Sequence, residues 1–189
     1  MWIEVLVRLI VPDPWSFTVF DTLRRKFGLT EIVDVRRLSG WDIQVETDDE
    51  DEARSTVESI MAETALLANP NRDRYFVRSR PGPIPTDFLK VDEKGQVFVI
   101  KVIDIDDIIG RSKQNIVRER LGIKTIKRIT YSTIWLLEIA GDSDMAQGLA
   151  SEVAVAREWR KGLLANPHSQ KAVVARLSDY LRRMPQGGS

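Results

Sequence analysis

Apolar and polar side chains alternate at the start of the chain. Ile3, Val5, Val7, Leu9 and Val11 fall on one side of an extended segment, with Glu4 and Arg8 on the other. A period of two residues is typical of a strand that buries one face. We therefore expect a half-buried strand over residues 2–11.

A helical period replaces this alternation after Pro14. Four apolar residues then recur at helical spacing: Phe17, Phe20, Leu23 and Phe27. Asp13 or Ser16 is suited to cap the first turn of a helix, and Gly28 follows a basic last turn, which is typical of a helix end. The sequence thus predicts a helix that buries these four side chains.

The next elements are two short strands and a second helix. Residues 32–37 and 41–46 have strand patterns, and Leu38-Ser39-Gly40 between them predicts a hairpin loop. An acidic run, Asp48 to Glu52, precedes a helix that we expect to reach about Ala68, because acidic side chains favour a helix N terminus more often than they bind metal. A strand over residues 74–79 completes the order βαββαβ.

The whole unit is written twice. Leu66-Leu67-Ala68-Asn69-Pro70 returns as Leu163-Leu164-Ala165-Asn166-Pro167, at an offset of 97 residues. Upstream, Gly28 falls on Gly122 and Trp41 on Trp135 at an offset of 94. Such a long period indicates a duplicated domain. We expect a first repeat at 1–80, a stiff proline-rich linker at 81–89 and a second repeat at 90–184.

The second repeat follows the same pattern up to its end. We expect strands over 97–103, 126–131 and 135–139, a helix from Asp106 or Asp107 to Gly122, and a long helix over 145–165. Residues 171–184 leave two interpretations open. Alignment with the first repeat predicts a strand over 171–174, whereas Val173, Leu177, Tyr180 and Leu181 have helical spacing. We favour a C-terminal helix there.

Composition and charge restrict the function classes. The 189 residues include no cysteine and no apolar run near the roughly 20 residues that span a bilayer, so a cytoplasmic location without membrane contact is expected. Residues 1–80 carry 11 basic and 15 acidic side chains, and residues 81–189 carry 17 and 13. Neither half has the basic excess that nucleic-acid binding requires.

The search for catalytic chemistry yields no constellation. His168, the one histidine, has no legible partner, and Asp104-Ile105-Asp106-Asp107 lacks the pattern of a calcium loop, so helix capping is the favoured interpretation. Neither GxGxxG nor a Walker loop is present. We therefore expect no catalytic residues, no cofactor and no metal. The interface candidates are Trp41, Trp135, Asn69, Pro70, Asn166 and Pro167; stacking of the two tryptophans on bases is less favoured than packing.

A family resemblance rests on the first repeat. Its residues are Glu31 to Arg36, the strand that begins at Trp41, and Leu66-Leu67-Ala68-Asn69-Pro70 followed by Asp73-Arg74-Tyr75. They resemble PurS, the small subunit of phosphoribosylformylglycinamidine synthase. The second repeat is similar over 96–170, more loosely. The first repeat departs from the family at Ser16, where a glycine is usual, and both repeats lack the family's Gly-Lys hairpin.

The resemblance implies an α+β fold of two tandem ferredoxin-like repeats, packed as a pseudo-dimer. It also implies a non-catalytic subunit that joins a PurL-like synthetase and a PurQ-like glutaminase, an ATP-dependent ligase complex of purine biosynthesis. Single-repeat members are homodimers, so a tandem chain looks like a fused dimer and is compatible with a further homodimer. The alternative is an ACT-like module that binds a small regulatory molecule between its paired domains.

Overall fold

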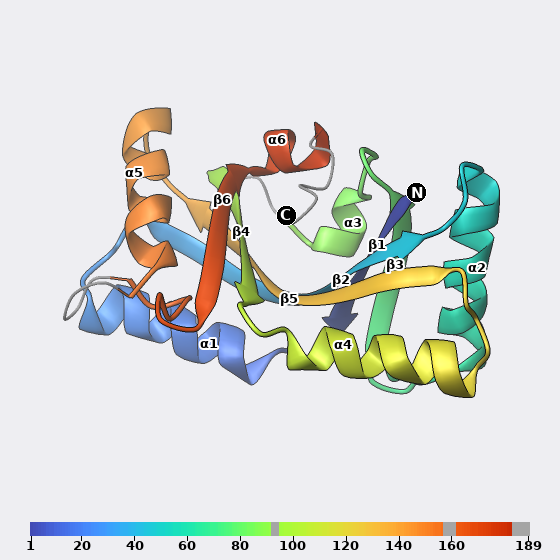
Figure 1. Ribbon diagram of the computed structural model, residues 1–189. Helices are drawn as coiled ribbons and strands as arrows, with labels where there is room; N and C mark the ends of the chain where they lie inside the picture. The colour runs from blue at the N-terminus through green and yellow to red at the C-terminus, as the bar shows by residue number, and fades with distance from the viewer. Residues whose placement is uncertain (92–94, 157–161, 183–189) are drawn as a thin grey trace.

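The chain forms one six-stranded antiparallel sheet with the strand order β3-β1-β2-β5-β4-β6 (Figure 1). This computed structural model describes residues 1–91, 95–156 and 162–182. The first repeat comprises β1 (Trp2–Leu9), α1 (Pro14–Asp21), the π-helical turn η1 (Thr22–Lys26), β2 (Ile32–Val45), α2 (Glu50–Glu63) and β3 (Asp73–Ser79). The second comprises β4 (Gln96–Asp104), α4 (Ile108–Asn115), η2 (Ile116–Arg120), β5 (Ile126–Ile139), α5 (Ser143–Ala154) and β6 (Gln170–Arg176). The α+β class and the pairing of the repeats as a pseudo-dimer are confirmed.

A pseudo-twofold axis passes through the pairing of β2 with β5. Trp41 pairs with Tyr131. Their equivalents in the other repeat, 94 positions away, are Trp135 and Arg37, and these two residues pair as well. The pair Ser39–Thr133 maps onto itself and therefore marks the axis. The outer strands keep the same correspondence, since β1 and β3 pair with their neighbours as β4 and β6 do.

The predicted hairpin at residues 38–40 is wrong. β2 is one continuous strand of 14 residues, and β5 is its equal in length. Leu38 and Trp41 are both buried, on opposite faces of the sheet, so the alternation of faces continues through the expected turn. A Cβ at Gly40 would lie 2.6 Å from the Ile134 side chain, which shows that glycine serves close packing here and not a turn. Because β2 pairs with β5 over its whole length, its backbone N–H and C=O groups form hydrogen bonds that a hairpin at residues 38–40 would prevent.

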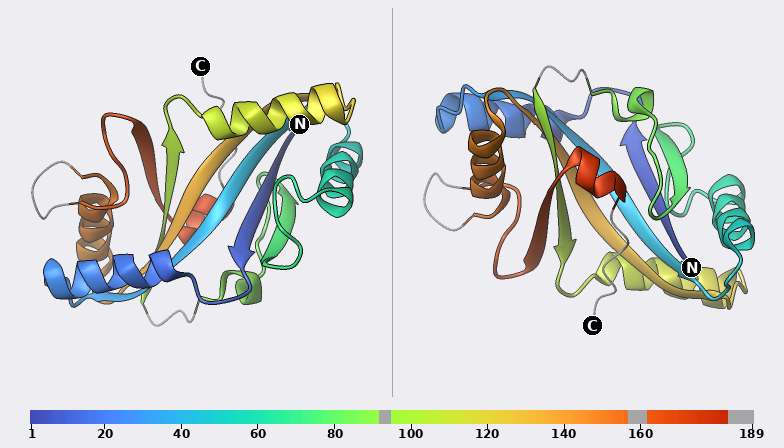
Figure 2. Two further views of the ribbon diagram at one scale, coloured as in Figure 1. Left: turned by 90° about the horizontal axis from the view of Figure 1, so that it is seen from below. Right: turned by 90° about the horizontal axis from the view of Figure 1, so that it is seen from above.

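Each repeat completes the core of the other on the face that carries α1, α2, α4 and α5. Val19 and Leu23 of the first repeat pack in one cluster with Phe98 and Ala150 of the second. Val117 of η2 packs in the other cluster, beside α2 and β1 of the first repeat. In the view from below in Figure 2, α1 and α4 lie near opposite ends of the central strands. The two cores are therefore shared between the repeats.

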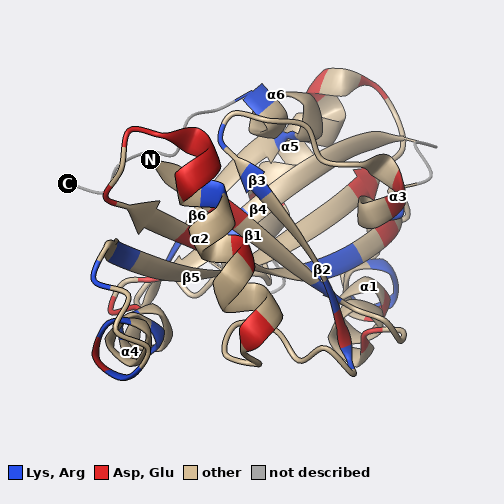
Figure 3. Cartoon of the chain, turned by 90° about the vertical axis from the view of Figure 1, so that its right-hand side faces the viewer, with Lys and Arg blue, Asp and Glu red and all other residues tan. Residues whose placement is uncertain are grey.

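Helix beginnings follow the sequence, but the ends of α2 and α5 do not. Asp13 caps α1, and the acidic first turn of α2, red in Figure 3, follows the capping residue Asp49. Gly28 and Gly122 both adopt positive φ after their helices, at 76° and 72°. However, α2 ends at Glu63 and α5 at Ala154, because Thr64 and Val155 take extended backbone. Of the predicted helix over 145–165, residues 157–161 lie outside the described residues.

The second face of the sheet is covered by the linker and the C-terminal segment. The linker is not an extended spacer: it contains the helical turn α3 (Thr86–Leu89), and it buries Ile84, Phe88 and Leu89 against the sheet. The predicted helix over 171–184 is only partly right. Gln170–Arg176 is the edge strand β6, as alignment with the first repeat indicated, and the helix α6 (Leu177–Arg182) follows it. In the part of the chain that the structure describes, no helix is long and apolar enough to span a bilayer.

Candidate interaction surface

The two tryptophans of the candidate set lie at the junction of the repeats. Trp41 of β2 faces Tyr131 of β5 with ring centroids 4.8 Å apart, and its Nε1 donates a hydrogen bond to the carbonyl of Leu67 at 3.0 Å. Trp135 pairs with Arg37 across the same seam. Both tryptophans are buried, so within this chain they pack between the repeats and present little surface to another molecule.

The two Asn-Pro elements form matching turns. The Asn69 side chain accepts from the N–H of Asn71, and its carbonyl accepts from two further N–H groups. Asn166 does the same for His168, which is exposed. Each turn leads into the last strand of its repeat. The structure thus shows a turn-forming role for Asn69 and Asn166, which Pro70 and Pro167 follow, and the first of these turns comes two residues after the Leu67 carbonyl that binds Trp41.

An exposed apolar patch surrounds the start of α1. Ile10 and Val11 begin the β1–α1 connection, and Trp15 and Phe17 occupy the first turn of α1; the side chains of Trp15 and Phe17 are 61% and 62% exposed. The Arg37 guanidinium lies over the Trp15 ring, 5.9 Å from its centroid, and binds both carboxylate oxygens of Asp13 at 2.9 and 3.0 Å. Large exposed apolar patches mark interaction sites in soluble proteins. We name Ile10, Val11, Trp15 and Phe17 the α1 patch.

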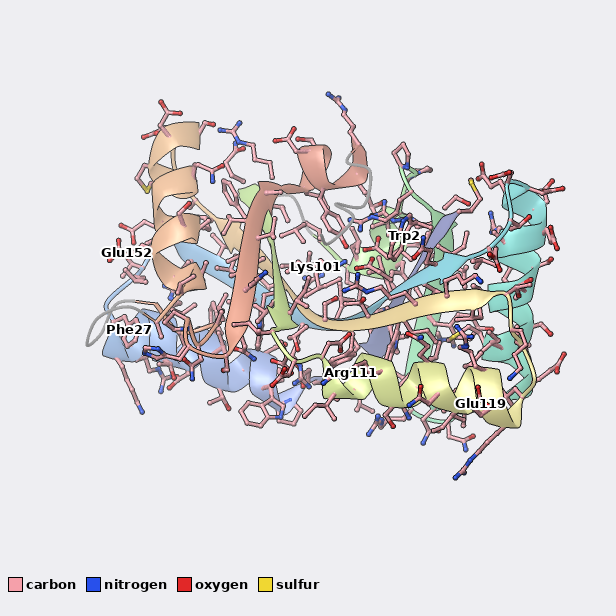
Figure 4. All side chains as sticks on the ribbon, in the orientation of Figure 1. Trp2, Phe27, Lys101, Arg111, Glu119 and Glu152 are labelled. Atoms are coloured by element: carbon pink, nitrogen blue, oxygen red, sulfur yellow. The ribbon has the colours of Figure 1, made fainter. Side chains whose placement is uncertain are left out.

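A second apolar patch occupies the corresponding place in the other repeat. Ile105, Ile108 and Ile109 precede or begin α4, and Ile108 is 69% exposed. Arg111, labelled in Figure 4, lies near the same end of α4. A hollow of about 370 Å³ links this α4 patch to the first repeat, because its lining includes Ile109 and Lys113 together with Asp13 and Arg37. The two patches therefore flank the pseudo-twofold axis on the helical face.

A further hollow opens where β1 diverges from β2. Its volume is about 350 Å³, and Ile10, Val11 and Phe17 of the α1 patch form part of its wall. We name it the β1–β2 wedge. Its charged lining residues are Arg8, Arg36, Arg37, Lys90, Asp13 and Asp34. Buried Nε of Arg8 has no hydrogen-bond partner among the described residues, and the guanidinium lies 5.5 Å from the Phe88 ring centroid.

The second face carries a buried charge cluster centred on Glu4. This carboxylate is fully buried and binds Arg78 at 2.7 Å, while Lys101 joins it to Asp42. Tyr180 of α6 donates its hydroxyl hydrogen to Glu4. Lys101, labelled in Figure 4, comes from β4 and so ties the second repeat to the first. The cluster links both repeats and the C-terminal helix.

The electrostatics of this cluster depend on mutual neutralisation. Burial alone raises the pKa of Glu4, but the positive charges of Lys101, Arg80 and Arg78 outweigh it and leave that pKa below its ordinary value. Burial and the negative charge of Glu4 raise the pKa of Tyr180 well above its ordinary value, so the phenol stays a donor. Carboxylate and phenol thus hold the protonation states that their hydrogen bond requires.

The cluster has no polar counterpart in the second repeat. Glu4 lies between Asp42 and Arg78 in the sheet register, whereas Val99, at the equivalent position of β4, lies between Leu136 and Ala175. The sheet is therefore charged around Glu4 and apolar around the equivalent Val99.

Two of these features escaped the sequence analysis. Phe17 has helical spacing with Phe20 and Leu23, yet it points to solvent, because α1 buries only the stripe that contains Val19 and Leu23. Glu4 alternates with the core residues of β1, yet α6 and the linker cover that face as well. A signal was available for the patches: Trp15 and Ile109 occupy equivalent positions of the duplicated sequence, and both are large and apolar.

These features define a pseudo-dimer of ferredoxin-like units with two exposed apolar patches on its helical face. Comparison with models of known protein families finds a match for the first repeat. Residues 1–80 match the PurS family, described as phosphoribosylformylglycinamidine (FGAM) synthase. The resemblance seen in the sequence is thus confirmed for the first repeat, and the match does not extend into the second. No curated protein matches the chain.

Proposed function

We propose that this chain is a non-catalytic, PurS-like subunit of the FGAM synthase complex of purine biosynthesis. In this role it supports the assembly of a PurL-like synthetase with a PurQ-like glutaminase in the cytoplasm. The observation that carries the proposal is the match of residues 1–80 to the PurS family. The tandem second repeat takes the place of the second subunit of a homodimer.

The exposed apolar patches support an assembly role. Seven large apolar side chains gather at the starts of α1 and α4, where none of them contributes to the shared cores: Ile10, Val11, Trp15, Phe17, Ile105, Ile108 and Ile109. Keeping such side chains in water is unfavourable unless a partner covers them. We propose the α1 patch and the α4 patch as the docking surface for the synthetase or the glutaminase.

Co-purification tests the proposal. The tagged chain is expressed with the PurL-like synthetase and the PurQ-like glutaminase of the same organism, and complexes are separated by gel filtration. We expect a complex that contains the chain and the synthetase, and no glutaminase or ATPase turnover by the chain alone. If neither subunit binds, and a free amino acid raises the melting temperature instead, the ACT-like alternative is correct and this proposal fails.

A paired set of variants tests the docking surface. Trp15→Ala with Phe17→Ala removes two exposed rings from the α1 patch, and Leu121→Ala with Met145→Ala removes exposed apolar surface elsewhere. We expect the first pair to weaken synthetase binding at least tenfold and the second pair to leave it unchanged. Equal affinity of both pairs would show that the α1 patch is not the docking surface.

A further inference from the structure

The outer edge of β5 is equivalent to the edge of β2 that lines the β1–β2 wedge, so the two edges can be compared. Pairing of β4 with β5 stops at Val102–Thr133, so before that point the N–H groups of β5 that point away from β2 have no strand partner. Side chains of α4 and its cap supply acceptors instead. Ile129 N–H donates to Gln114 Oε1 at 3.2 Å, and Tyr131 N–H donates to the Asp107 carboxylate at 3.3 Å.

The equivalent edge of β2 has no such acceptors. Pairing of β1 with β2 stops at Val7–Ser39, and the residues equivalent to Ile129 and Tyr131 are Val35 and Arg37. Since N–H directions alternate along an antiparallel strand, these two N–H groups point away from β5, as their counterparts do. Phe20 stands in the place of Gln114 and has no polar atom in its side chain.

Asp13, the counterpart of Asp107, is also engaged elsewhere. Its carboxylate binds the Arg37 guanidinium and accepts from the N–H groups of Trp15 and Ser16. Among the described residues, no acceptor meets the N–H groups of Val35 and Arg37. Both residues line the β1–β2 wedge, and so does Arg8 with its unpartnered Nε. Two backbone donors without acceptors therefore belong to residues that line one hollow, together with the positively charged Arg8.

We propose that the β1–β2 wedge binds a short extended segment of a partner protein that carries a carboxylate side chain. An extended chain presents carbonyl oxygens at every second residue, roughly 7 Å apart, which matches the spacing of the Val35 and Arg37 N–H groups. The carboxylate meets Arg8 and the exposed Lys90 at the wall of the wedge. This proposal rests on the proposed function, because the partner is a subunit of the same complex.

The α1 patch makes a protein segment the favoured occupant. Ile10, Val11 and Phe17 belong both to the patch and to the wall of the wedge, so a partner seated on the patch lies at its mouth. In the described part of the chain this site belongs to the first repeat, because Gln114 and Asp107 accept the hydrogen bonds of the equivalent N–H groups in the second. The chain therefore binds one such segment, although its outline is pseudo-symmetric.

Amide hydrogen exchange of the free chain tests the open edge itself. We expect the amides of Val35 and Arg37 to exchange at least tenfold faster than those of Ile129 and Tyr131. Equal protection of the two pairs would overturn the proposal without any partner. On addition of the synthetase or the glutaminase, we expect protection at Val35 and Arg37. Protection by free glutamate and by neither subunit would show a small carboxylate as the occupant and overturn the proposal.

Variants that alter the wedge test the partner. Phe20→Gln gives the first repeat the acceptor of the second, and Arg8→Gln removes a positive charge from the wall of the wedge; Arg54→Gln is a control with the same charge change on the exposed face of α2. We expect the first two to weaken binding of the subunit at least tenfold, at one segment per chain, and the control to leave it unchanged. If wild type binds but both wedge variants bind equally well, this inference fails and the proposed function stands. If wild type binds neither subunit, both fail.

Discussion

Replacing Glu4 by glutamine should cost more stability than any comparable change on the surface. Glu4→Gln keeps the shape of the side chain but removes the charge that balances Arg78, Arg80 and Lys101, and leaves Asp42 as the other carboxylate in contact with them. All three cations have side chains no more than 9% exposed, so water cannot replace the lost carboxylate. Removing one partner of a buried ion pair typically costs about 3–5 kcal/mol.

Urea unfolding at pH 7, followed by tryptophan fluorescence, measures this loss. With a denaturant slope of about 2 kcal/mol per molar, the expected loss moves the midpoint down by about 2 M. Glu58→Gln is the matched control, because Glu58 pairs with Arg54 on the exposed face of α2, where such pairs contribute at most about 0.5 kcal/mol. If Glu4→Gln unfolds within about 1 kcal/mol of wild type, water or relaxation compensates the cations and the reasoning is refuted.

Other predictions concern pH, backbone space and the shared core. Because the folded pKa of Glu4 is below its unfolded value of about 4.3, its contribution is complete above that pH and is lost as pH falls through the folded pKa; Glu4→Gln should flatten this acid limb in pH-dependent unfolding. The raised pKa of Tyr180 predicts that stability falls as pH rises above about 10, and Tyr180→Phe should remove that fall in melting curves. Gly110→Ala should lose about 1–3 kcal/mol in urea unfolding, because its Cβ would lie 2.5 Å from the Ile129 carbonyl oxygen, whereas Gly148→Ala, with open space in α5, should gain about 0.5–1 kcal/mol. Residues 1–80 alone should sediment as a dimer, since they lack η2 and β5; a stable monomer would contradict the shared core.

Local signals in the sequence predicted local structure well. Asp13 caps α1 because its carboxylate reaches the N–H groups of the first turn, and this requires no knowledge of the rest of the chain. Gly28 and Gly122 adopt the positive φ that favours glycine. The repeat itself was readable, because Trp41 and Trp135 occupy equivalent positions of the central strands. The fold class followed from these features.

Features set by distant segments could not be predicted in the same way. A continuous β2 depends on β5, which lies about 90 residues further along the chain, and the local Ser39-Gly40 signal favoured a turn. The burial of Glu4 depends on Lys101 and Tyr180, which lie 97 and 176 residues further along the chain. The exposure of Phe17 depends on which stripe of α1 meets the sheet, and an all-round apolar helix start leaves that choice open. The surface patches were missed for this reason.

The unequal second face has a consequence for how this chain can change over generations. In a homodimer of identical subunits, a new glutamate at position 4 appears in both halves at once, and each half must find cations for it. Fusion removes this coupling, so that Glu4 is neutralised by Lys101 of the other half while the equivalent Val99 stays in an apolar layer. The two halves can therefore accumulate different substitutions on this face, while both keep the β2–β5 register that is centred on Ser39 and Thr133. Duplication here relaxes a symmetry constraint on sequence. The equivalent helices α2 and α5, which have 14 and 12 residues, differ in length as a second sign of the same freedom.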